Sequence, residues 1–350
     1  MSELVNVFDY EALAASRLGA GAHAFYAGGA NDELTLRENV AAFRRLQLRP
    51  RVLRDVAGAT TAVTVLGEEL SMPVLVAPVA YQRAAHPDGE VGMAEGVRAA
   101  GTLMCLSTFA TAAPAEVAAT GVRRWYQLYV PRDRGLGAEL CRQARDLGFT
   151  ALVVTVDLPV SGRRERDLRS GWTLPPELLV HSVGLRGLHP HEFAAQVSPA
   201  VTWDDVDALA AEARLPVILK GILTAEDARL ACERGVAGIV VSNHGGRQLD
   251  GVPATIDVLP EIVDAVAGET VVLLDGGIRR GTDVVKALAL GAAAVLVGRP
   301  PLWGLAVGGR DGVRHVLELL RAEVELALQL LGCGSPAELT PEHVRRATLA

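Results

Sequence analysis

Eight short apolar segments recur along this chain, and stretches with helical spacing separate most of them. The segments are rich in Val, Leu and Ile, and they lack the alternation of apolar and polar residues found in strands with one solvent-exposed face. They are 74–77, 103–107, 125–130, 151–156, 216–219, 238–242, 271–274 and 294–297. The helical patterns between them are 89–100, 136–147, 203–213, 224–234, 255–267 and 281–290. Eight units of buried strand and helix predict an α/β protein with a (β/α)8 TIM barrel.

The rest of the chain is predicted to belong to the same domain, because no Ser-rich or Gly-rich linker divides residues 1–350. Residues 1–70 are expected to form an N-terminal extension of helices and a short hairpin that covers the bottom of the barrel. Residues 71–331 form the barrel, with its last outer helix within 311–331, and residues 332–350 form a C-terminal tail. The longest interruption, 158–201, is predicted to be a mobile loop over the active face.

The composition favours a cytoplasmic protein that binds small molecules. A net charge of −7 argues against nucleic acid as the main partner. The longest strongly apolar stretch, 287–298, is too short to cross a membrane, and the first residues lack a signal-peptide core. The four cysteines are widely separated and form no metal-binding pattern, so we expect reduced thiols and no metal site.

Polar residues and glycines follow nearly every predicted strand, and a barrel brings all these strand ends to one rim. The segment SNHGGRQLD at 242–250 supplies His244, which exchanges a proton near neutral pH, and Arg247, which offers a fork for a carboxylate or phosphate. A base beside an anion-binding group indicates an enzyme that acts on an acid. The other strand-end residues are Pro78, Val79, Ala80, Ser107, Gln127, Tyr129, Thr155, Asp157, Lys220, Ser242, Asp275, Gly276, Gly277, Gly298 and Arg299.

Two further features point to a bound cofactor. Only two of the 34 basic residues are lysines; Lys220 ends a strand and is a site candidate, whereas Lys286 lies in a helical pattern and is expected to be solvated. The last two strands are followed by DGGIRRG and GRP, which place glycines, Arg279 and Arg299 where barrels often bind phosphate. These turns lack the Walker lysine and the GxGxxG spacing, so a phosphate-bearing cofactor of another kind is predicted.

Simpler interpretations of these residues remain open at this point. His244 and Arg247 are also compatible with a solvated surface turn, and the glycines of the last two turns with tight packing. Ser107, Gln127 and Thr155 are each compatible with ordinary capping of a strand end.

Taken in order, the motifs resemble the FMN-dependent 2-hydroxy acid oxidase and dehydrogenase family. The resemblance runs from about Val7 to Glu342. Its most specific part is SNHGGRQLD around His244. The other motifs are YAGGAND, LSTFAT, YQLYV, TVDLPVSGRRERD, LKGILTAEDA, DGGIRRGTDVVKALALGA and GRP.

The resemblance implies oxidation of an (S)-2-hydroxy acid by FMN. His244 would take a proton from the substrate, Asp157 would orient the imidazole, Arg164 and Arg247 would bind the carboxylate, and Tyr129 would hydrogen-bond the substrate. It leaves open whether the α-hydrogen leaves as a hydride or as a proton. It also implies a homotetramer. The FMN site would comprise Lys220 at the N1/O2 edge together with Pro78, Val79, Ala80, Ser107, Gln127, Thr155, Ser242, Asp275, Gly276, Gly277, Arg279, Gly298 and Arg299.

Two departures from the family pattern bear on the substrate. Phe25 stands where many relatives have a tyrosine that contacts the carboxylate, with Tyr26 next to it, and Phe109 stands where glycolate oxidase has a tryptophan. Both phenylalanines are also compatible with simple core packing. A more apolar pocket favours an aromatic substrate of the mandelate or 4-hydroxymandelate type. Ala80 matches the residue typical of the oxidases, which favours dioxygen as acceptor and hydrogen peroxide as product.

Three alternatives stay open from the sequence. The substrate could be an aliphatic 2-hydroxy acid such as lactate, glycolate or a longer chain. Lys220 could instead form a Schiff base in an aldolase-type barrel, with a sugar phosphate at the phosphate site. A flavin-binding protein without catalysis is the third alternative.

Overall fold

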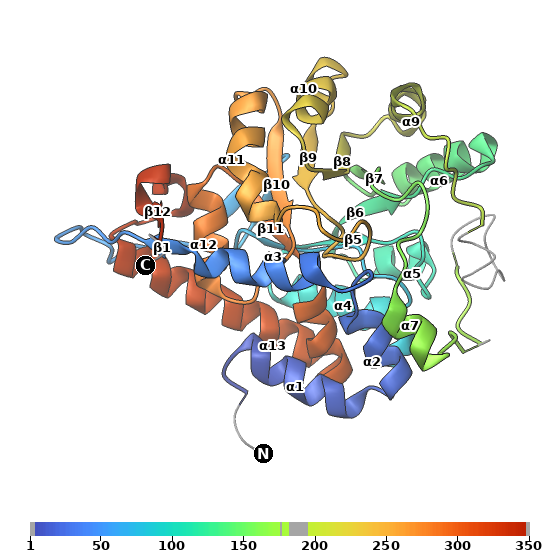
Figure 1. The fold of residues 1–350 in the computed structure, drawn as a ribbon, viewed down its shortest axis with the longest axis horizontal. Helices are drawn as coiled ribbons and strands as arrows, with labels where there is room; N and C mark the ends of the chain where they lie inside the picture. The colour runs from blue at the N-terminus through green and yellow to red at the C-terminus, as the bar shows by residue number, and fades with distance from the viewer. Residues whose placement is uncertain (1–3, 176, 182–194, 348–350) are drawn as a thin grey trace.

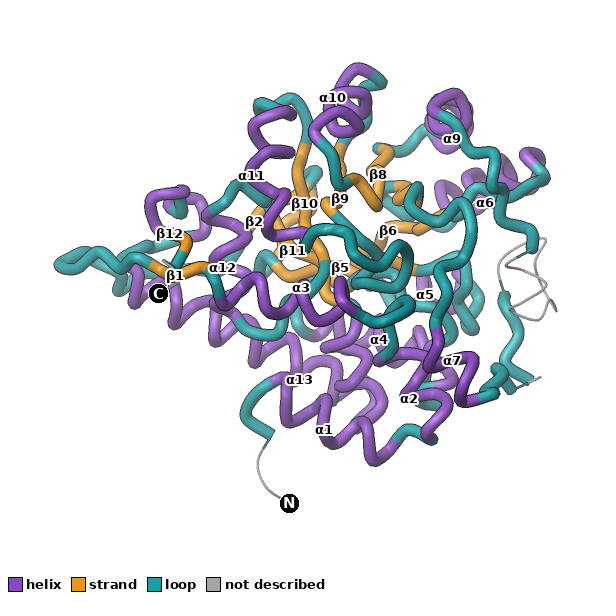
Figure 2. Tube along the Cα trace, viewed as in Figure 1, coloured by secondary structure: helices purple, strands orange, loops and turns teal. Residues whose placement is uncertain are grey.

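The computed structural model describes residues 4–175, 177–181 and 195–347, and it contains the predicted barrel (Figure 1). Eight parallel strands close in the order β10-β11-β4-β5-β6-β7-β8-β9, and Figure 2 shows them gathered inside a ring of helices. Their bounds are β4 Val74–Val76, β5 Leu103–Leu106, β6 Arg123–Leu128, β7 Leu152–Thr155, β8 Val217–Ile222, β9 Gly238–Val241, β10 Val271–Asp275 and β11 Ala294–Val297. Each of the eight predicted strands is confirmed. Most of these strand residues are fully buried, which explains the missing alternation in sequence.

The six predicted helices between strands are also confirmed. Two short helices, α5 (Pro114–Ala119) and α7 (Glu165–Ser170), were not predicted, because six residues are too few to show a helical period. Two of the longer helices begin at residues that cap them. The side chains of Asp133 and Thr224 accept hydrogen bonds from backbone N–H groups in the first turns of α6 and α10. The helices are α4 Gly89–Ala99, α5 Pro114–Ala119, α6 Arg134–Asp146, α7 Glu165–Ser170, α9 Trp203–Ala213, α10 Ala225–Glu233, α11 Thr255–Val266, α12 Gly281–Ala289 and α13 Arg299–Leu331.

A hairpin closes the amino-terminal end of the barrel, as predicted. It consists of β2 Val63–Val65 and β3 Glu68–Leu70. Val65 and Leu70 pack with the inward-facing cluster of strand side chains, which includes Leu103 and Trp125. Next to the hairpin, Ser71 donates its N–H to the carbonyl of Gly101, just before β5 begins.

The N-terminal helices do not cover the bottom of the barrel, so this part of the prediction is wrong. Helix α1 (Val7–Arg17) packs along α13, α2 (Ala20–Ala27) packs on α7, and α3 (Leu34–Arg44) packs on α11. The connection between α2 and α3 reaches the opposite rim, where Ala30 donates its N–H to the carbonyl of Gly246 at 2.8 Å. The spacing of apolar residues in a helix shows which of its sides is buried. It does not show which end of the barrel the helix packs against, so the local sequence could not predict this placement.

Residues near both ends of the chain pair with each other. Strand β1 (Leu46–Leu48) is antiparallel to β12 (Val344–Arg346), so the predicted tail adds a strand. Three short 3-10 helices also occur, at Gln82–Ala84, Pro336–Glu338 and Pro341–His343. Helix α13 is longer than the predicted 311–331 because it begins at Arg299 and bends at Gly308 and Gly309, where the backbone leaves the helical region.

Lys286 is only half-exposed, in contrast to the solvated side chain that was predicted, and its Nζ donates to the carbonyl of Phe43 at 2.9 Å. The predicted loop 158–201 contains α7 and residues that line the main cavity. Residues 182–194 lie outside the described part, and the loop's mobility stays a prediction.

Candidate active site

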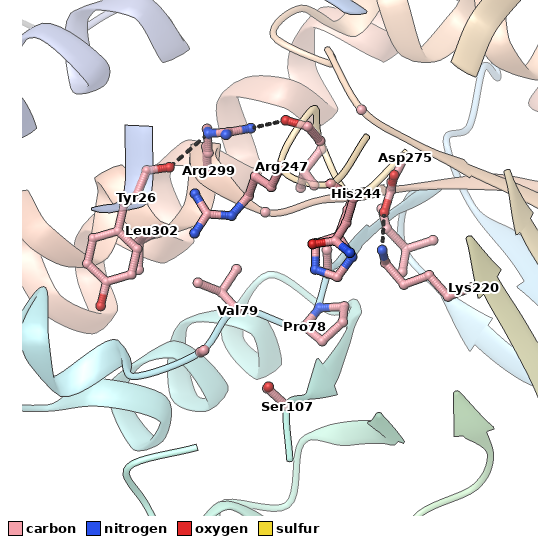
Figure 3. A pocket seen from close by; sticks show the side chains of 18 of the residues that line it. Tyr26, Pro78, Val79, Ser107, Lys220, His244, Arg247, Asp275, Arg299 and Leu302 are labelled. Atoms are coloured by element: carbon pink, nitrogen blue, oxygen red, sulfur yellow. Dashed lines mark hydrogen bonds and ion pairs between the residues drawn. The ribbon is translucent and has the colours of Figure 1, made fainter. Parts of the chain in front are cut away.

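A cavity of about 410 Å³ opens at the carboxyl ends of the barrel strands. Figure 3 shows His244 and Arg247 on one side of it, Pro78 and Val79 opposite them, and Lys220 with Asp275 at another edge. The cavity therefore gathers residues from many units of the barrel. The predicted site residues that line it are Phe25, Pro78, Val79, Ala80, Ser107, Phe109, Tyr129, Arg164, Lys220, His244, Arg247, Asp275, Gly276, Gly277, Arg279, Gly298 and Arg299.

His244 and Asp157 form a hydrogen-bonded pair beside the cavity. Asp157 Oδ1 lies 2.9 Å from His244 Nδ1, so the other ring nitrogen, Nε2, points away from the carboxylate. His244 is a non-glycine residue with φ of +58°, and its N–H donates to Ser242 Oγ at 3.1 Å. Such a backbone persists only where the surroundings hold it, which is common at functional sites.

The environments of the pair shift both pKa values downward. Burial lowers the pKa of His244, which the Asp157 carboxylate partly offsets and the Lys220 cation reinforces. Burial raises the pKa of Asp157, but its attraction to His244, their hydrogen bond and the charge of Lys220 outweigh burial and lower it. At neutral pH the site therefore holds a neutral imidazole oriented by an ionised carboxylate.

Tyr129 lies next to this pair. Its hydroxyl is 3.4 Å from His244 Nε2, and the two rings stack with centroids 6.4 Å apart. Burial raises the pKa of Tyr129 to about 12, so its hydroxyl keeps its proton at neutral pH. The phenol and the imidazole thus face one point in the cavity.

Two arginines supply positive charge near this point. The guanidinium of Arg164 lies 5.6 Å from the ring centroid of Phe25, and that of Arg247 lies 5.1 Å from it. Arg164 Nε pairs with Asp167 at 3.0 Å. Burial lowers the pKa of Arg247 well below its usual value, and Arg164 and Arg299 add to this effect. Cations that disfavour one another in a cavity favour an incoming anion.

Arg247 and Arg299 also bind the carboxyl end of α2. Arg247 Nη1 donates to the carbonyls of Phe25 and Gly28 at 2.6 and 3.0 Å. Arg299 donates to the carbonyls of Tyr26, Gly28 and Gly245 at 2.9, 2.9 and 3.0 Å. The unpaired carbonyls at a helix end attract such cations. These contacts bring Phe25 to the cavity, and they were not predicted.

Lys220 and Asp275 form a buried ion pair. Lys220 Nζ lies 3.2 Å from Asp275 Oδ2 and donates to Ser242 Oγ at 2.9 Å. Burial lowers the pKa of Lys220, but Asp275 and Asp157 outweigh burial and raise it, so the amine is a cation. Within the described structure, Asp275 Oδ1 is buried with no hydrogen-bond partner, which leaves an acceptor at the edge of the cavity.

The turns after β10 and β11 bring backbone close to the cavity. Gly276 and Gly277 have φ of +94° and +83°. A β-carbon at Gly277 would lie 2.0 Å from the carbonyl oxygen of Asn39, so only glycine fits there. Arg279 lines the cavity beside these turns and is 3.5 Å from Glu11 Oε2. Burial, together with Arg279, lowers the pKa of Arg299 to about 10. These cations and glycines suit a phosphate group.

Three predicted cofactor residues do not line the cavity: Gln127, Thr155 and Ser242. Gln127 Nε2 donates to Thr155 Oγ1 at 3.0 Å, and its Oε1 accepts from Ser107 Oγ at 3.3 Å. Ser242 is bound by Lys220. They form a hydrogen-bonded layer behind Ser107 and Lys220, and their contact with a cofactor stays a prediction.

Aromatic rings form one wall of the cavity. Tyr81 and Phe109 have ring centroids 5.6 Å apart, and Phe109 and Tyr129 have centroids 5.0 Å apart. Phe25 continues the wall toward Tyr81 at 6.0 Å. Tyr26 is buried behind it and donates its hydroxyl to the carbonyl of Tyr81 at 2.6 Å. No sequence signal identified Tyr81, which follows Pro78, Val79 and Ala80 in the same loop.

Glu90 holds the two loops that carry this wall. It is fully buried at the start of α4. Its Oε1 accepts from the N–H groups of Gln82 and Thr111 at 3.0 and 2.9 Å. Its Oε2 accepts from Thr111 Oγ1 and Ala112 N at 2.7 and 3.0 Å. Glu90 was not predicted, because an acidic residue in the first turn of a helix is ordinarily explained by the helix dipole.

The described residues contain no group of three or more His, Cys, Asp or Glu residues placed to hold a metal ion. None of the described helices is both long enough and apolar enough to cross a membrane. All four cysteines are free.

Comparisons with known proteins agree with this geometry. Residues 14–346 match the family described as FMN-dependent dehydrogenase. The chain is 50% identical to L-lactate oxidase from Nostoc sp. (strain PCC 7120), over 95% of this chain and 96% of the relative. It is 49% identical to glycolate oxidase 5 from Oryza sativa subsp. japonica, over 98% and 96%. The solved structure of mandelate oxidase with (S)-4-hydroxymandelic acid is 44% identical, with a TM-score of 0.94 over 99% of this chain and 100% of that one.

The residues present fit FMN. The cavity offers cations and glycine backbone for a phosphate at Arg279, Arg299 and the turns after β10 and β11. The unpartnered Asp275 Oδ1 and the Lys220 cation offer polar contacts at its other edge. The chain belongs to the family of FMN-dependent dehydrogenases, which confirms the family, the FMN cofactor and the enzyme class, a 2-hydroxy acid oxidase, predicted from its sequence.

Proposed function

We propose that this enzyme oxidises an aromatic (S)-2-hydroxy acid to the 2-oxo acid and transfers the electrons to dioxygen, giving hydrogen peroxide. The observation that carries the proposal is the arrangement around His244: its Nδ1 is held by Asp157, and its Nε2 faces Tyr129 in a cavity lined by Arg164 and Arg247. A neutral base beside two cations suits removal of a proton from an acid whose carboxylate the cations bind.

His244 is the proposed base. Its lowered pKa keeps the imidazole neutral at pH 7, ready to accept a proton at Nε2. The Asp157 carboxylate then stabilises the imidazolium that forms, because the pair is already hydrogen-bonded. The same base serves removal of the hydroxyl proton and removal of the α-proton, so the arrangement is compatible with both routes.

Arg164, Arg247 and Tyr129 are proposed to position the substrate. The two guanidinium groups would bind the carboxylate, and the Tyr129 hydroxyl would hydrogen-bond the substrate oxygen beside His244. Only one nitrogen of Arg247 is engaged with the carbonyls of α2, which leaves its other N–H groups for an anion. Orientation by three fixed groups lowers the entropy cost of reaching a reactive geometry.

FMN, when bound, supplies the acceptor for two electrons from the substrate. We propose that Lys220 places its charge beside the flavin ring, with Pro78, Val79 and Ala80 against the ring face. Asp275, the glycine turns, Arg279 and Arg299 would hold the ribityl chain and phosphate. Ser107, Gln127, Thr155 and Ser242 would complete the polar contacts of the ring.

The aromatic side chain of the substrate is the finer part of the proposal. Phe25, Tyr81, Phe109 and Tyr129 give the cavity a wall of rings, which favours an aryl group through edge and offset contacts. Similarity to a mandelate oxidase supports this choice. Similarity to lactate and glycolate oxidases favours the second candidate, an aliphatic 2-hydroxy acid.

The Schiff-base alternative is not favoured by the surroundings of Lys220. A lysine attacks a carbonyl as the neutral amine, whereas Asp275 and Asp157 favour the ammonium form here. Nor would that reaction use His244, Arg164 and Arg247 together.

An anaerobic bleaching experiment tests the proposal. The FMN-loaded enzyme is mixed with glycolate, lactate, 2-hydroxyoctanoate, mandelate and 4-hydroxymandelate, and the flavin absorbance is followed. We expect the aromatic acids to bleach the flavin fastest, and air to restore colour with release of peroxide. Absence of bleaching with every acid would contradict the reaction, and faster bleaching by aliphatic acids would contradict the aromatic preference.

The quaternary structure and location also stay proposals. Val52 and Leu53 are 80% and 102% exposed, and this loop meets the end of α13 where Leu330 is exposed. Such exposed apolar groups support burial between subunits, in keeping with the homotetramer that the sequence predicts. Light scattering of the purified protein measures this directly. A cytoplasmic location is proposed from sequence composition alone.

A further inference from the structure

A second cavity lies beside the active site. It has a volume of about 240 Å³. Its lining comes from the ends of strands β7 and β8, from helix α9, and from the segment that precedes α9. Figure 1 shows α9 on the same side of the molecule as β7 and β8. The lining of the cavity is mixed: eight of the fourteen residues are Val, Leu or Ile, with Val130, Val206, Leu219 and Ile222 buried, whereas Thr155, Thr202 and Asp227 are polar. The aliphatic part of this lining can bind an apolar group, because binding there removes apolar surface from water.

Two side chains separate this cavity from the active site. Leu158 and Val197 line both cavities. Leu158 follows Asp157, the partner of His244, by one residue. Val197 forms a bridge with Pro131, and the neighbouring Ser198 donates its N–H to the carbonyl of Val130 at 2.9 Å. Backbone contacts thus hold the segment that carries Val197, whereas Leu158 is partly exposed.

The second cavity also lies next to the aromatic wall. Tyr129 lines the active site, and the next residue, Val130, lines the second cavity. Thr155 contributes a polar atom, but its Oγ1 already accepts a hydrogen bond from Gln127 Nε2 at 3.0 Å. Thr202 and Asp227 also line the cavity, so its aliphatic residues alone suit the apolar end of a group whose polar end is held at Tyr129 and His244.

We propose that the second cavity is a subsite for an alkyl group in the para position of an aryl 2-hydroxy acid, entered when the Leu158 side chain rotates. This inference rests on the proposed function and adds a substrate class to it: acids with a side chain longer than a phenyl ring. The ring would contact Phe109 and Tyr129, and the alkyl group would pass between Leu158 and Val197.

Binding of the 2-oxo acid products tests the subsite without turnover. Phenylglyoxylate and 4-propylphenylglyoxylate are titrated into the oxidised, FMN-loaded enzyme, and the flavin absorbance change gives each Kd. Val206→Phe fills the second cavity from α9. We expect Val206→Phe to raise the ratio of the Kd for 4-propylphenylglyoxylate to the Kd for phenylglyoxylate by about tenfold or more. The reason is that a single methylene bound in an apolar pocket can change affinity by about tenfold. Leu158→Ala, which widens the passage between the two cavities, should lower this ratio of Kd values.

Two further variants keep the test decisive. Val201→Phe also fills the second cavity, and because Val201 is only half-buried, this variant should fold even if Val206→Phe does not. Val91→Phe on α4 makes the same chemical change at a half-buried valine that lines neither cavity, and it should leave the ratio of Kd values unchanged.

An unchanged ratio in both filling variants would overturn the proposal. It would also be overturned if Val206→Phe slowed reoxidation by dioxygen while the ratio stayed constant, because the cavity would then be a path for gas. Failure of the proposed function looks different, since no 2-hydroxy acid would then bleach the flavin. Normal bleaching by mandelate with an unchanged ratio would overturn the subsite alone.

Discussion

The side chain of Asp157 lies directly against the bare α-carbon of Gly221. A β-carbon at residue 221, where φ is +117°, would come within 2.6 Å of Asp157 Cβ and 2.9 Å of its backbone nitrogen. Gly221 follows Lys220 in β8. The absence of a side chain at residue 221 therefore makes room for the carboxylate that binds His244.

Gly221→Ala should move Asp157 and slow flavin reduction by about tenfold or more, in addition to a strain cost of about 1–3 kcal/mol from the backbone angle. Stopped-flow bleaching with mandelate measures the rate, and urea unfolding measures the stability. Gly235→Ala is a matched control, because Gly235 also has a positive φ, +68°, but nothing lies within 4 Å of its added carbon. Equal rate losses in the two variants would contradict the contact argument.

Asp157→Asn should alter the pH profile of kcat/KM. In the wild-type enzyme burial lowers the pKa of His244 and the Asp157 carboxylate raises it. Because removal of that negative charge lowers the pKa further, the acid limb should move to lower pH. The plateau should fall by about a hundredfold or more, because the imidazolium loses its partner. Asp311→Asn, at an exposed carboxylate on α13, should change neither feature. Movement of the limb to higher pH would refute the assignment.

Lys220→Met should destabilise the apoprotein by about 3–5 kcal/mol, because it leaves the buried Asp275 carboxylate unpaired. It should also weaken FMN binding. Urea unfolding of the apoprotein and quenching of FMN fluorescence measure the two effects separately. The double variant Lys220→Met/Asp275→Asn should regain part of the stability without regaining the affinity. FMN affinity equal to wild type in Lys220→Met would argue against a cation at the flavin ring.

Glu90→Gln should lower the free energy of unfolding by about 1–3 kcal/mol, because the amide NH2 would meet backbone N–H groups where a carboxylate oxygen now accepts. We also expect a raised KM for mandelate, since Glu90 holds the loops that carry Tyr81 and Phe109. Glu95→Gln is the control on the same helix, where the carboxylate is partly exposed and 3.7 Å from Arg310. Similar stability losses in both variants would show that the hydrogen bonds of Glu90 contribute little.

Phe109→Leu should reduce the preference for aromatic substrates. Phe109 contacts the rings of Tyr81 and Tyr129, and an aryl substrate would add a further ring contact. Loss of such a contact costs about 0.5–1.5 kcal/mol, or about two- to tenfold in affinity. The ratio of kcat/KM for mandelate over lactate measures the effect, and an unchanged ratio would assign Phe109 to core packing only.

The strands, the outer helices and the rim that gathers the candidate site residues could be predicted because each depends on local sequence. A run such as Val271–Asp275 is buried on both faces, so its composition alone identifies it. The rule that strand ends meet at one rim then brought Asp157, Lys220 and His244 together, although 87 residues separate the first from the last.

Contacts between segments far apart in sequence could not be predicted in this way. The carbonyls of α2 bind Arg247 and Arg299, and no local pattern in residues 20–27 shows that this helix ends at the active site. Glu90 has the sequence environment of an ordinary helix start, and only the fold shows the four donors around its carboxylate. The second cavity likewise arises from the packing of several elements.

The arginines Arg247 and Arg299 bind main-chain carbonyls at the end of α2, so the length of this helix matters to the cavity as well as its side chains. A side-chain substitution at residue 25 or 26 leaves these carbonyls in place, whereas an insertion or deletion within residues 20–28 would carry them away from the two guanidinium groups. Such a change in length should therefore disturb the cavity even though it lies far from His244 in the sequence.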